Sequence, residues 1–512
     1  MPGLFGGVGV RAFAHSPFLQ AFYNNFVETD KVLVIVYLGG GADGLNMLVP
    51  TDSYSQLTKA RPDVILPEKS LLKLQGVQNL GLHPSMSALQ AMYNEGQMAV
   101  VQNVGYPEQN YSHFRSTDIW MTGSSADEVL TSGWLGRYLN HEFPNYPFDY
   151  PNAVMPDPLA IQIGYNLSVA FQGPVSAMGM VVGDPTSFYN LVNDIEEPVE
   201  NSAYGSKLGY VRLVTKQSQI YGQVVKSAAE RVNKQSAYPN DNYLADQLKV
   251  VARLIAGGLK TRVYMVTHDG FDTHSNQVDG SDHTKGMHAT LLKKLGEAIS
   301  AFQKDLEYQN KADRVLTMTV SEFGRRIISN ASKGTDHGAA APVMLFGKNI
   351  KPGIIGKNPA LPIEIGVEDN LPMQYDFRSI YSTVLKDWFC LGENDVQALF
   401  SDVFPSLPLL ASSPCITTAA QEEYRQAGKS WIEAYPNPFT NSTRISFEAN
   451  DAPLTVQLFN PSGQLMAQIA KGRFAQGRHE VTWDAQGLPA GNYFVRYQSQ
   501  WVQQGKWVTK VN

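Results

Sequence analysis

The sequence predicts an α/β fold, with a mostly parallel sheet flanked by helices, followed by a small C-terminal antiparallel β-sandwich. Three observations lead to this expectation. Continuous apolar runs end in polar, glycine-rich turns, and helical segments separate these runs. Near the C-terminus the pattern changes to short alternating runs split by turn residues, which is typical of antiparallel strands.

The apolar runs are rich in β-branched residues, and such runs are typical of strands that are covered on both faces. The first of them, KVLVIVYL, leads directly into a run of three glycines. We expect strands at residues 31–38, 97–104, 261–266, 314–320 and 342–346.

Helices are expected between the strands, at residues 86–95, 242–259 and 290–306. The last of these segments places its leucine, isoleucine and phenylalanine residues on one face at helical spacing. Strands that alternate with helices need crossover connections, which produce a parallel sheet with both faces covered. Ligands of such sheets bind beyond the carboxyl ends of the strands, so a site is expected there.

A chain of 512 residues exceeds what one hydrophobic core usually organises, so several parts are expected. We divide it into a lead-in (1–29), the α/β domain (30–410), a linker (411–433) and the sandwich (434–512). The lead-in has an apolar glycine/valine stretch before an Ala-x-Ala pattern, and it lacks a positively charged front. It is either the remnant of an export signal or a flexible segment.

Composition excludes some classes of function. The formal charge of -6 is spread along the chain, whereas binding to nucleic acid needs a concentrated basic surface. No stretch approaches the roughly 20 apolar residues of a membrane-spanning helix. The two cysteines, Cys390 and Cys415, can form one disulfide or remain two unrelated thiols.

Polar side chains gather at the ends of the expected strands, in segments 43, 110–115, 268–274, 321–326 and 334–338. Carboxylates together with imidazoles suit a divalent metal, with zinc favoured and manganese or calcium as alternatives. The candidate metal ligands are Asp43, Asp272, His274, Glu322, Asp336 and His337. Ser112 at a helix start is the candidate nucleophile, and Arg115 one turn later is a candidate anion-binding group.

Each candidate also has an ordinary structural explanation. Asp43 and Asp336 suit glycine-rich turns, and Ser112 suits a helix cap. Arg325 and Arg326 are expected to be a solvated pair, and His268, His283 and His288 are expected at the surface. The arrival of five separate segments at one sheet edge favours a site over these explanations.

Several of these segments together resemble the DUF1501 family, which is grouped with the alkaline-phosphatase/sulfatase superfamily. The matching motifs are GGGADGLN (39–46), LHP (82–84), YSHFRSTDIW (111–120), GWLGRYL (133–139), FDTHSNQ (271–277), SEFGRR (321–326) and GTDHG (334–338). The resemblance implies an alkaline-phosphatase-like fold. It further implies Asp43 as a first metal ligand and Ser112 as nucleophile. Asp272 with His274 would be ligands of one metal, and His337 the late histidine.

The sequence departs from the superfamily at SEFG, where an Asp-His-Gly segment is usual. Glu322 can replace the aspartate, but Phe323 cannot replace the histidine as a ligand. In another register, Asp336 and His337 take the Asp-His-Gly role and the late histidine has no counterpart. The resemblance therefore leaves two functional hypotheses. One is a metal-dependent hydrolase of phosphate or sulfate esters, acting on a small anionic ester or a surface glycan. The other is a catalytically degenerate binding or structural protein on the same fold.

The C-terminal part resembles the type A sorting domain of the type IX secretion system of the Bacteroidota. The matching residues are YPNPF (435–439), LFNPSGQ (458–464) and LPAGNY (488–493). The resemblance implies recognition of residues 434–512 by the secretion machinery. It also implies transit through the periplasm and a secreted or cell-surface location.

Overall fold

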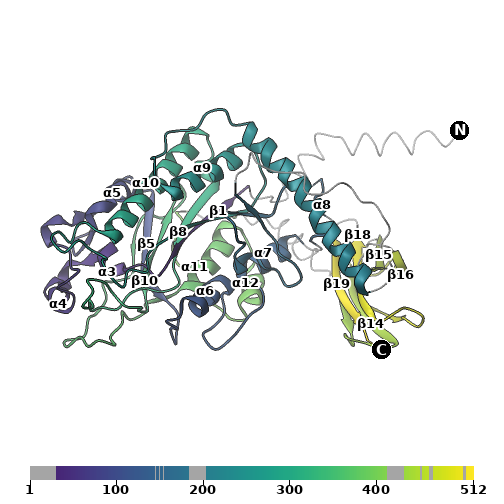
Figure 1. Ribbon diagram of the computed structural model, residues 1–512. Coiled ribbons are helices and arrows are strands. Elements are labelled where there is room, and N and C mark those ends of the chain that lie inside the picture. The colour runs from purple at the N-terminus through teal and green to yellow at the C-terminus, as the bar shows by residue number, and fades with distance from the viewer. Residues whose placement is uncertain are drawn as a thin grey trace. The chain divides into compact units, whose positions relative to one another are not determined.

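A nine-stranded sheet forms the centre of the α/β unit (Figure 1). Eight of its strands are paired in one path, and β12 (Tyr375–Asp376) pairs with β5. The path runs β11 (Gly353–Ile355), β5 (Met98–Gly105), β10 (Ala341–Phe346), β9 (Val315–Val320), β1 (Val32–Gly39), β8 (Val263–Asp269), β6 (Ala160–Ile163) and β7 (Met180–Val182).

The computed structural model describes residues 30–143, 146–148, 150–153, 155–183, 203–411, 415, 432–449, 453–460, 465–499 and 503–511. These residues form two compact units, one made of 31–199 and 208–414 and one that includes 415–512. The expected lead-in at 1–29 and most of the expected linker at 411–433 lie outside the described residues. The boundaries at 30, 411 and 434 stay a prediction.

The sheet is mostly parallel, as predicted. The exception is β10, whose direction determines which residues reach the edge of the sheet where the candidate site lies. β1 runs parallel to both of its neighbours, β8 and β9. β10 runs antiparallel to β5 and to β9. The start of β10 therefore lies at the same edge of the sheet as the ends of β5 and β9.

Both faces of the sheet are covered, because β1 is predominantly apolar and its side chains alternate between two cores. Val32, Val34 and Val36 face the first core, and Leu33 and Ile35 face the second. Figure 1 shows the two groups of helices on opposite faces. The first core is closed by α5 (Ser87–Asn94), α9 (Tyr243–Ala256) and α10 (Met287–Tyr308); the second by α6 (His113–Thr122), α7 (Trp134–Glu142), α11 (Phe377–Thr383) and α12 (Glu393–Phe400).

A small antiparallel sheet follows the glycine-rich turn after β1 and precedes α5. It contains β2 (Leu48–Pro50), β4 (Leu80–Leu82) and β3 (Leu72–Lys73), with α3 (Gly44–Met47) and α4 (Tyr54–Ala60) beside it in the chain. The long helix α8 spans Ala203–Glu230. No helix of the described residues is long and apolar enough to cross a membrane.

The C-terminal unit is the predicted antiparallel β-sandwich. Phe447 and Trp483 of one sheet and Val456 and Tyr497 of the other belong to a single buried cluster, so the two sheets pack face to face. One sheet has the order β13 (Ile432–Tyr435), β14 (Ser442–Ala449), β17 (Gly477–Asp484); the other has the order β16 (Leu465–Arg473), β15 (Pro453–Phe459), β18 (Gly491–Ser499), β19 (Gln503–Lys510).

The cysteines are not free thiols. Cys390 and Cys415 are both disulfide-bonded, which decides between the two alternatives that their spacing left open.

Candidate metal centre

Four strands on the two sides of β1, namely β5, β10, β9 and β8, bring polar groups to one edge of the sheet. Parallel strands deliver the residues that follow them, and the antiparallel β10 delivers the residues that precede it. The site takes His113 from the start of α6 after β5, Asp272 and His274 from after β8, Glu322 from after β9, and Asp336 and His337 from before β10.

The centre of this group is the carboxylate of Asp272, surrounded by imidazole nitrogens. Its Oδ1 lies 3.2 Å from His274 Nε2 and 3.3 Å from His337 Nε2. The two Nε2 atoms are themselves 2.9 Å apart. His113 Nε2 lies 3.5 Å from the other carboxylate oxygen, Asp272 Oδ2. Ligand-type atoms of His113, Asp272 and His337 all fall within 4.8 Å of one another.

The three rings share one arrangement, because the Nδ1 of each has an acceptor on its outer side. Carboxylate and carbonyl oxygens only accept, so each Nδ1 donates to its acceptor, and the Nε2 of each ring is turned towards Asp272. The acceptors are Glu322 Oε1 for His113 at 2.9 Å, Asp336 Oδ1 for His274 at 2.9 Å, and the Tyr111 carbonyl for His337 at 2.8 Å.

This donor set fits a divalent metal. Histidines that bind metals usually donate their second nitrogen to a carboxylate or carbonyl, as these three do. Zinc–ligand bonds are about 2.0–2.1 Å, so ligand atoms on one ion lie roughly 3–3.4 Å apart. The separations of 2.9, 3.2 and 3.3 Å among Asp272, His274 and His337 agree with that spacing.

The cluster is open to solvent. The side chain of Asp272 is 47% exposed and that of His274 is 43% exposed. Burial alone would raise the pKa of Asp272, but the hydrogen bond and charge of Arg325 lower it below its usual range. Burial, which outweighs the hydrogen bond to Tyr111, lowers the pKa of His337. Both shifts favour the metal-binding forms, an ionised carboxylate and a neutral imidazole.

Arg325 holds the turns around the cluster, and the expectation of a solvated arginine pair is wrong for it. Only 1% of the residue is exposed. Its guanidinium donates to the carbonyls of Gly41 and Thr335, both at 2.7 Å, of Phe271 at 3.1 Å and of Gly40, and to Asp272 Oδ1 at 2.7 Å. One buried fork therefore joins the segments after β1 and β8 to the segment before β10.

The glycine run after β1 is needed for this close packing. Gly40 and Gly41 have φ values of +117° and +78°, which few side chains tolerate. A Cβ on Gly40 would lie 2.2 Å from the backbone nitrogen of Asp272. A Cβ on Gly41 would lie 2.3 Å from the ring of Phe323.

Glu322 lies on the outer side of His113. Its Oε1 accepts from the Gly40 N–H at 2.8 Å as well as from His113, and its Oε2 accepts from Tyr37 at 3.1 Å. Burial and the nearby Glu322 charge raise the pKa of the Tyr37 phenol. These bonds explain how a carboxylate that is 1% exposed is accommodated, and they suit a group that orients His113.

Phe323 occupies the position of the expected histidine ligand and forms an apolar floor. It is 1% exposed, and its ring centroid lies 5.0 Å from that of His113 and 4.5 Å from that of His337. It packs against both imidazoles and offers no ligand atom.

Among the described residues, Asp43 has hydrogen-bond partners other than the members of this cluster. Its carboxylate is fully buried and accepts hydrogen bonds from Arg61 and, at 2.6 Å, from Gln277. His83 and His288 are near it and are also buried, so the expectation that His288 is a surface residue is wrong. His268, only 7% exposed, is likewise not at the surface. Burial lowers the pKa of His83 to about 3 and that of His288 to about 4.

The two candidate catalytic residues have different surroundings. Ser112 is exposed, and the chain on either side of it contacts the cluster through the Tyr111 carbonyl and the His113 ring. Within the described residues its hydroxyl makes no capping bond to α6. Arg115 instead contacts Asp118 and donates to the carbonyls of Ser125 at 3.2 Å and Ala126 at 3.1 Å and to that of Glu128.

His113 was absent from the predicted ligand set. The signal that could have found it is its place in the YSHFRSTDIW motif, directly after Ser112 and at the first residue of a helix that follows a strand.

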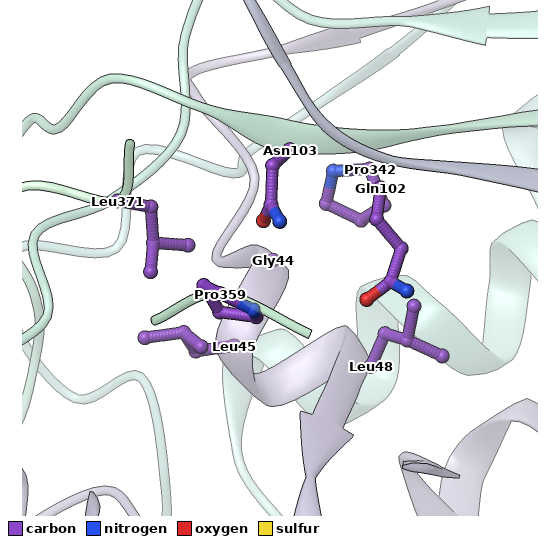
Figure 2. A pocket seen from close by; sticks show the side chains of 8 residues that line it. All are labelled: Gly44, Leu45, Leu48, Gln102, Asn103, Pro342, Pro359 and Leu371. Carbon is purple, nitrogen blue, oxygen red and sulfur yellow. The ribbon is translucent and has the colours of Figure 1, made fainter. Parts of the chain in front are cut away.

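A small pocket lies elsewhere in the α/β unit, beside the start of α3 (Figure 2). The side chains of Asn103 and Gln102 supply its polar groups, while Leu45 and Leu371 are part of its apolar wall. None of the described cluster residues is among those that line it.

Comparison with known families confirms both resemblances. Residues 215–396 match the model of the family described as "Protein of unknown function (DUF1501)", and residues 433–510 match the "Secretion system C-terminal sorting domain". The C-terminal sandwich is similar to secretion sorting domains. Such a domain implies recognition by secretion machinery and indicates a secreted or cell-surface protein. No curated protein matches the chain.

Similar solved structures come from the alkaline-phosphatase and sulfatase group. One concerns glycosaminoglycan metabolism by Bacteroides thetaiotaomicron (8% identity, 86% of this chain and 89% of that chain, TM-score 0.35). Another is a protein in the alkaline phosphatase superfamily from Vibrio parahaemolyticus (10% identity, 87% of this chain and 82% of that chain, TM-score 0.30). A third is a sulfatase from Pseudoalteromonas (10% identity, 91% of this chain and 86% of that chain, TM-score 0.31). Likeness at this level has no bearing on activity.

Proposed function

We propose that this protein is an exported, metal-dependent hydrolase of phosphate or sulfate esters. One observation carries the proposal: three imidazole Nε2 atoms, each oriented by an outer hydrogen bond, converge on Asp272 at a solvent-open sheet edge. His113, His274, His337 and Asp272 would hold the metal, and Glu322 and Asp336 would orient two of the rings. Three nitrogens with one carboxylate favour zinc over manganese or calcium.

A divalent metal held by these residues would supply a positive centre that polarises an ester oxygen. Ser112 would provide the nucleophile: its Oγ would bond to phosphorus or sulfur while the bond to the ester oxygen breaks, its proton would leave with the alcohol, and water would later release the anion from the serine. The free N–H groups at the start of α6 would hold the anionic oxygens. We leave Arg115 out of the reacting group, because its guanidinium holds the loop at 125–128.

The experiment has two readouts on the full-length protein. Elemental analysis after purification without chelators should find about one zinc per chain, and a panel of phosphate and sulfate esters should reveal turnover. Asp272→Ala and His274→Ala should remove both the metal and the turnover. His141→Ala is the matched control, because this histidine lies exposed on α7. Metal content and turnover that survive in both site variants would refute the proposal.

The second candidate is a surface-binding protein that has lost catalysis on the same fold. Phe323 favours it, since this buried ring replaces a ligand that the superfamily usually has. The cluster would then be joined by a proton on one imidazole in place of a metal. A folded protein that purifies without metal, takes up none and turns over no ester would support this candidate.

The export route is the finer part of the proposal. We propose that the type IX machinery of the Bacteroidota recognises residues 434–512 after passage through the periplasm. Deletion of 434–512 should leave the protein in the periplasm of a host that has this machinery, and secretion of the shortened chain would contradict the proposal.

A further inference from the structure

A buried chain of hydrogen bonds connects Asp43 to the two segments that carry the candidate metal ligands. Its Oδ2 accepts from Gln277 Nε2 at 2.6 Å and from Arg61 Nη2. Burial alone would raise the pKa of Asp43, but the charge of Arg61 and the Gln277 hydrogen bond lower it below its usual range. The carboxylate is therefore ionised, and both of its oxygens can only accept hydrogen bonds.

That property selects one orientation of the Gln277 side-chain amide. Because Asp43 has no proton to donate, the amide NH₂ group must face it, and the amide oxygen must face the other way. The oxygen Oε1 accepts from Thr335 Oγ1 at 2.7 Å and from Thr273 Oγ1 at 3.1 Å. Gln277, Thr273 and Thr335 are all 0% exposed, so water does not compete for these bonds.

The two threonines belong to the segments that carry the ligands. Thr273 lies between Asp272 and His274, and Thr335 directly precedes Asp336 and His337. Their backbones are also joined, since the Thr335 N–H donates to the Thr273 carbonyl at 3.1 Å. The amide oxygen of Gln277 thus joins the segment after β8 to the segment before β10.

We infer that Gln277, anchored by Asp43 and Arg61, is a positioning residue that sets the separation of the ligand pairs 272/274 and 336/337. Asp43, which the family resemblance implied as a ligand, is two hydrogen bonds away from the threonines that adjoin the candidate ligands. This inference rests on the proposed metal centre. The ligand atoms it governs are 2.9 to 3.3 Å apart, so a small shift of one segment spoils their common geometry.

Cobalt(II) titration of the full-length protein tests the inference, because the visible absorption of bound cobalt reports the number and arrangement of its ligands. Gln277→Met keeps the volume and the Asp43–Arg61 pair but removes both threonine contacts. Thr335→Val removes a single hydroxyl. Each variant should bind cobalt about tenfold more weakly, with an altered spectrum. The double variant should be no weaker than Gln277→Met alone, because both changes break the same chain of bonds.

Two controls separate positioning from loss of stability. Thr335→Ser retains the hydroxyl and should restore wild-type affinity and spectrum. Thr383→Val removes a buried hydroxyl in α11, where it donates to the Ser379 carbonyl at 2.7 Å, and should leave cobalt binding unchanged. Asp43→Asn should weaken binding like Gln277→Met; if this variant does not fold, the Gln277 and Thr335 variants still decide.

The outcomes distinguish the positioning role of Gln277 from the proposed metal centre on which it rests. Unchanged affinity in Gln277→Met and Thr335→Val, or an equal loss in Thr383→Val, would overturn the positioning role while the metal centre stands. A wild-type protein that takes up no cobalt or zinc would overturn the metal centre and the positioning role together.

Discussion

Replacing Arg325 with methionine should destabilise the α/β unit more than any surface change of charge. The variant fills similar space but leaves four carbonyls and the Asp272 carboxylate without their buried donor. A buried polar group that loses its partner costs about 1–3 kcal/mol, and a broken buried ion pair about 3–5 kcal/mol. Since Asp272 is half-exposed and can regain water, we expect a total loss of about 4 kcal/mol in the free energy of unfolding.

Urea unfolding followed by circular dichroism at the helix band measures this loss, because the described C-terminal sandwich contains strands and no helix. With a urea dependence of about 3 kcal/mol per molar or more for a unit of this size, the midpoint should fall by roughly 1 M. Lys348→Met is the control, since Lys348 makes an exposed ion pair with Asp313 that is worth about 1 kcal/mol or less. A midpoint for Arg325→Met within the range of the control would refute the idea that this fork holds the strand ends together.

Two further predictions concern histidines. His113→Ala should lower the zinc affinity at least about tenfold, measured by competition with a chelating dye. Phe114→Ala is the control and should leave the zinc affinity unchanged, because the neighbouring Phe114 side chain is 91% exposed. Equal losses of affinity in the two variants would show that His113 is not part of the metal centre. The second concerns pH: the folded protein holds His288 and His83 neutral, with pKa values of about 4 and about 3, while the unfolded chain takes up protons below about 6.5. Stability should therefore fall as pH drops from 6.5 towards 4, by up to about 1.4 kcal/mol per unit for each histidine, and His288→Gln should flatten that slope. An unchanged slope in His288→Gln would show that His288 does not contribute.

Local pattern was enough to place the main elements of the sheet. The expected strands at 31–38 and 314–320 agree with β1 and β9, and the expected helix at 290–306 lies within α10. These elements could be predicted because each buries a face whose apolar spacing is visible within a few residues. The expected place of the candidate site rests on the same kind of pattern, since parallel strands end at a common edge.

The direction of β10 could not be read in this way. Its run of apolar residues is equally compatible with a parallel or an antiparallel strand, and only pairing with β5 and β9 decides. The consequence for function is direct, because the antiparallel direction brings His337 to the same edge as Asp272.

The partners of charged side chains were also beyond the reach of local pattern. Arg325 looks like a solvated residue in the sequence, yet it is buried against carbonyls from segments that are remote in the chain. Asp43 is a candidate metal ligand in the sequence, yet in the structure Arg61 and Gln277 donate hydrogen bonds to its carboxylate. Spacing along the chain determines which faces are apolar and where strands end. Which of several nearby charged groups a carboxylate meets depends on distances set by packing, and those exist only in the folded protein.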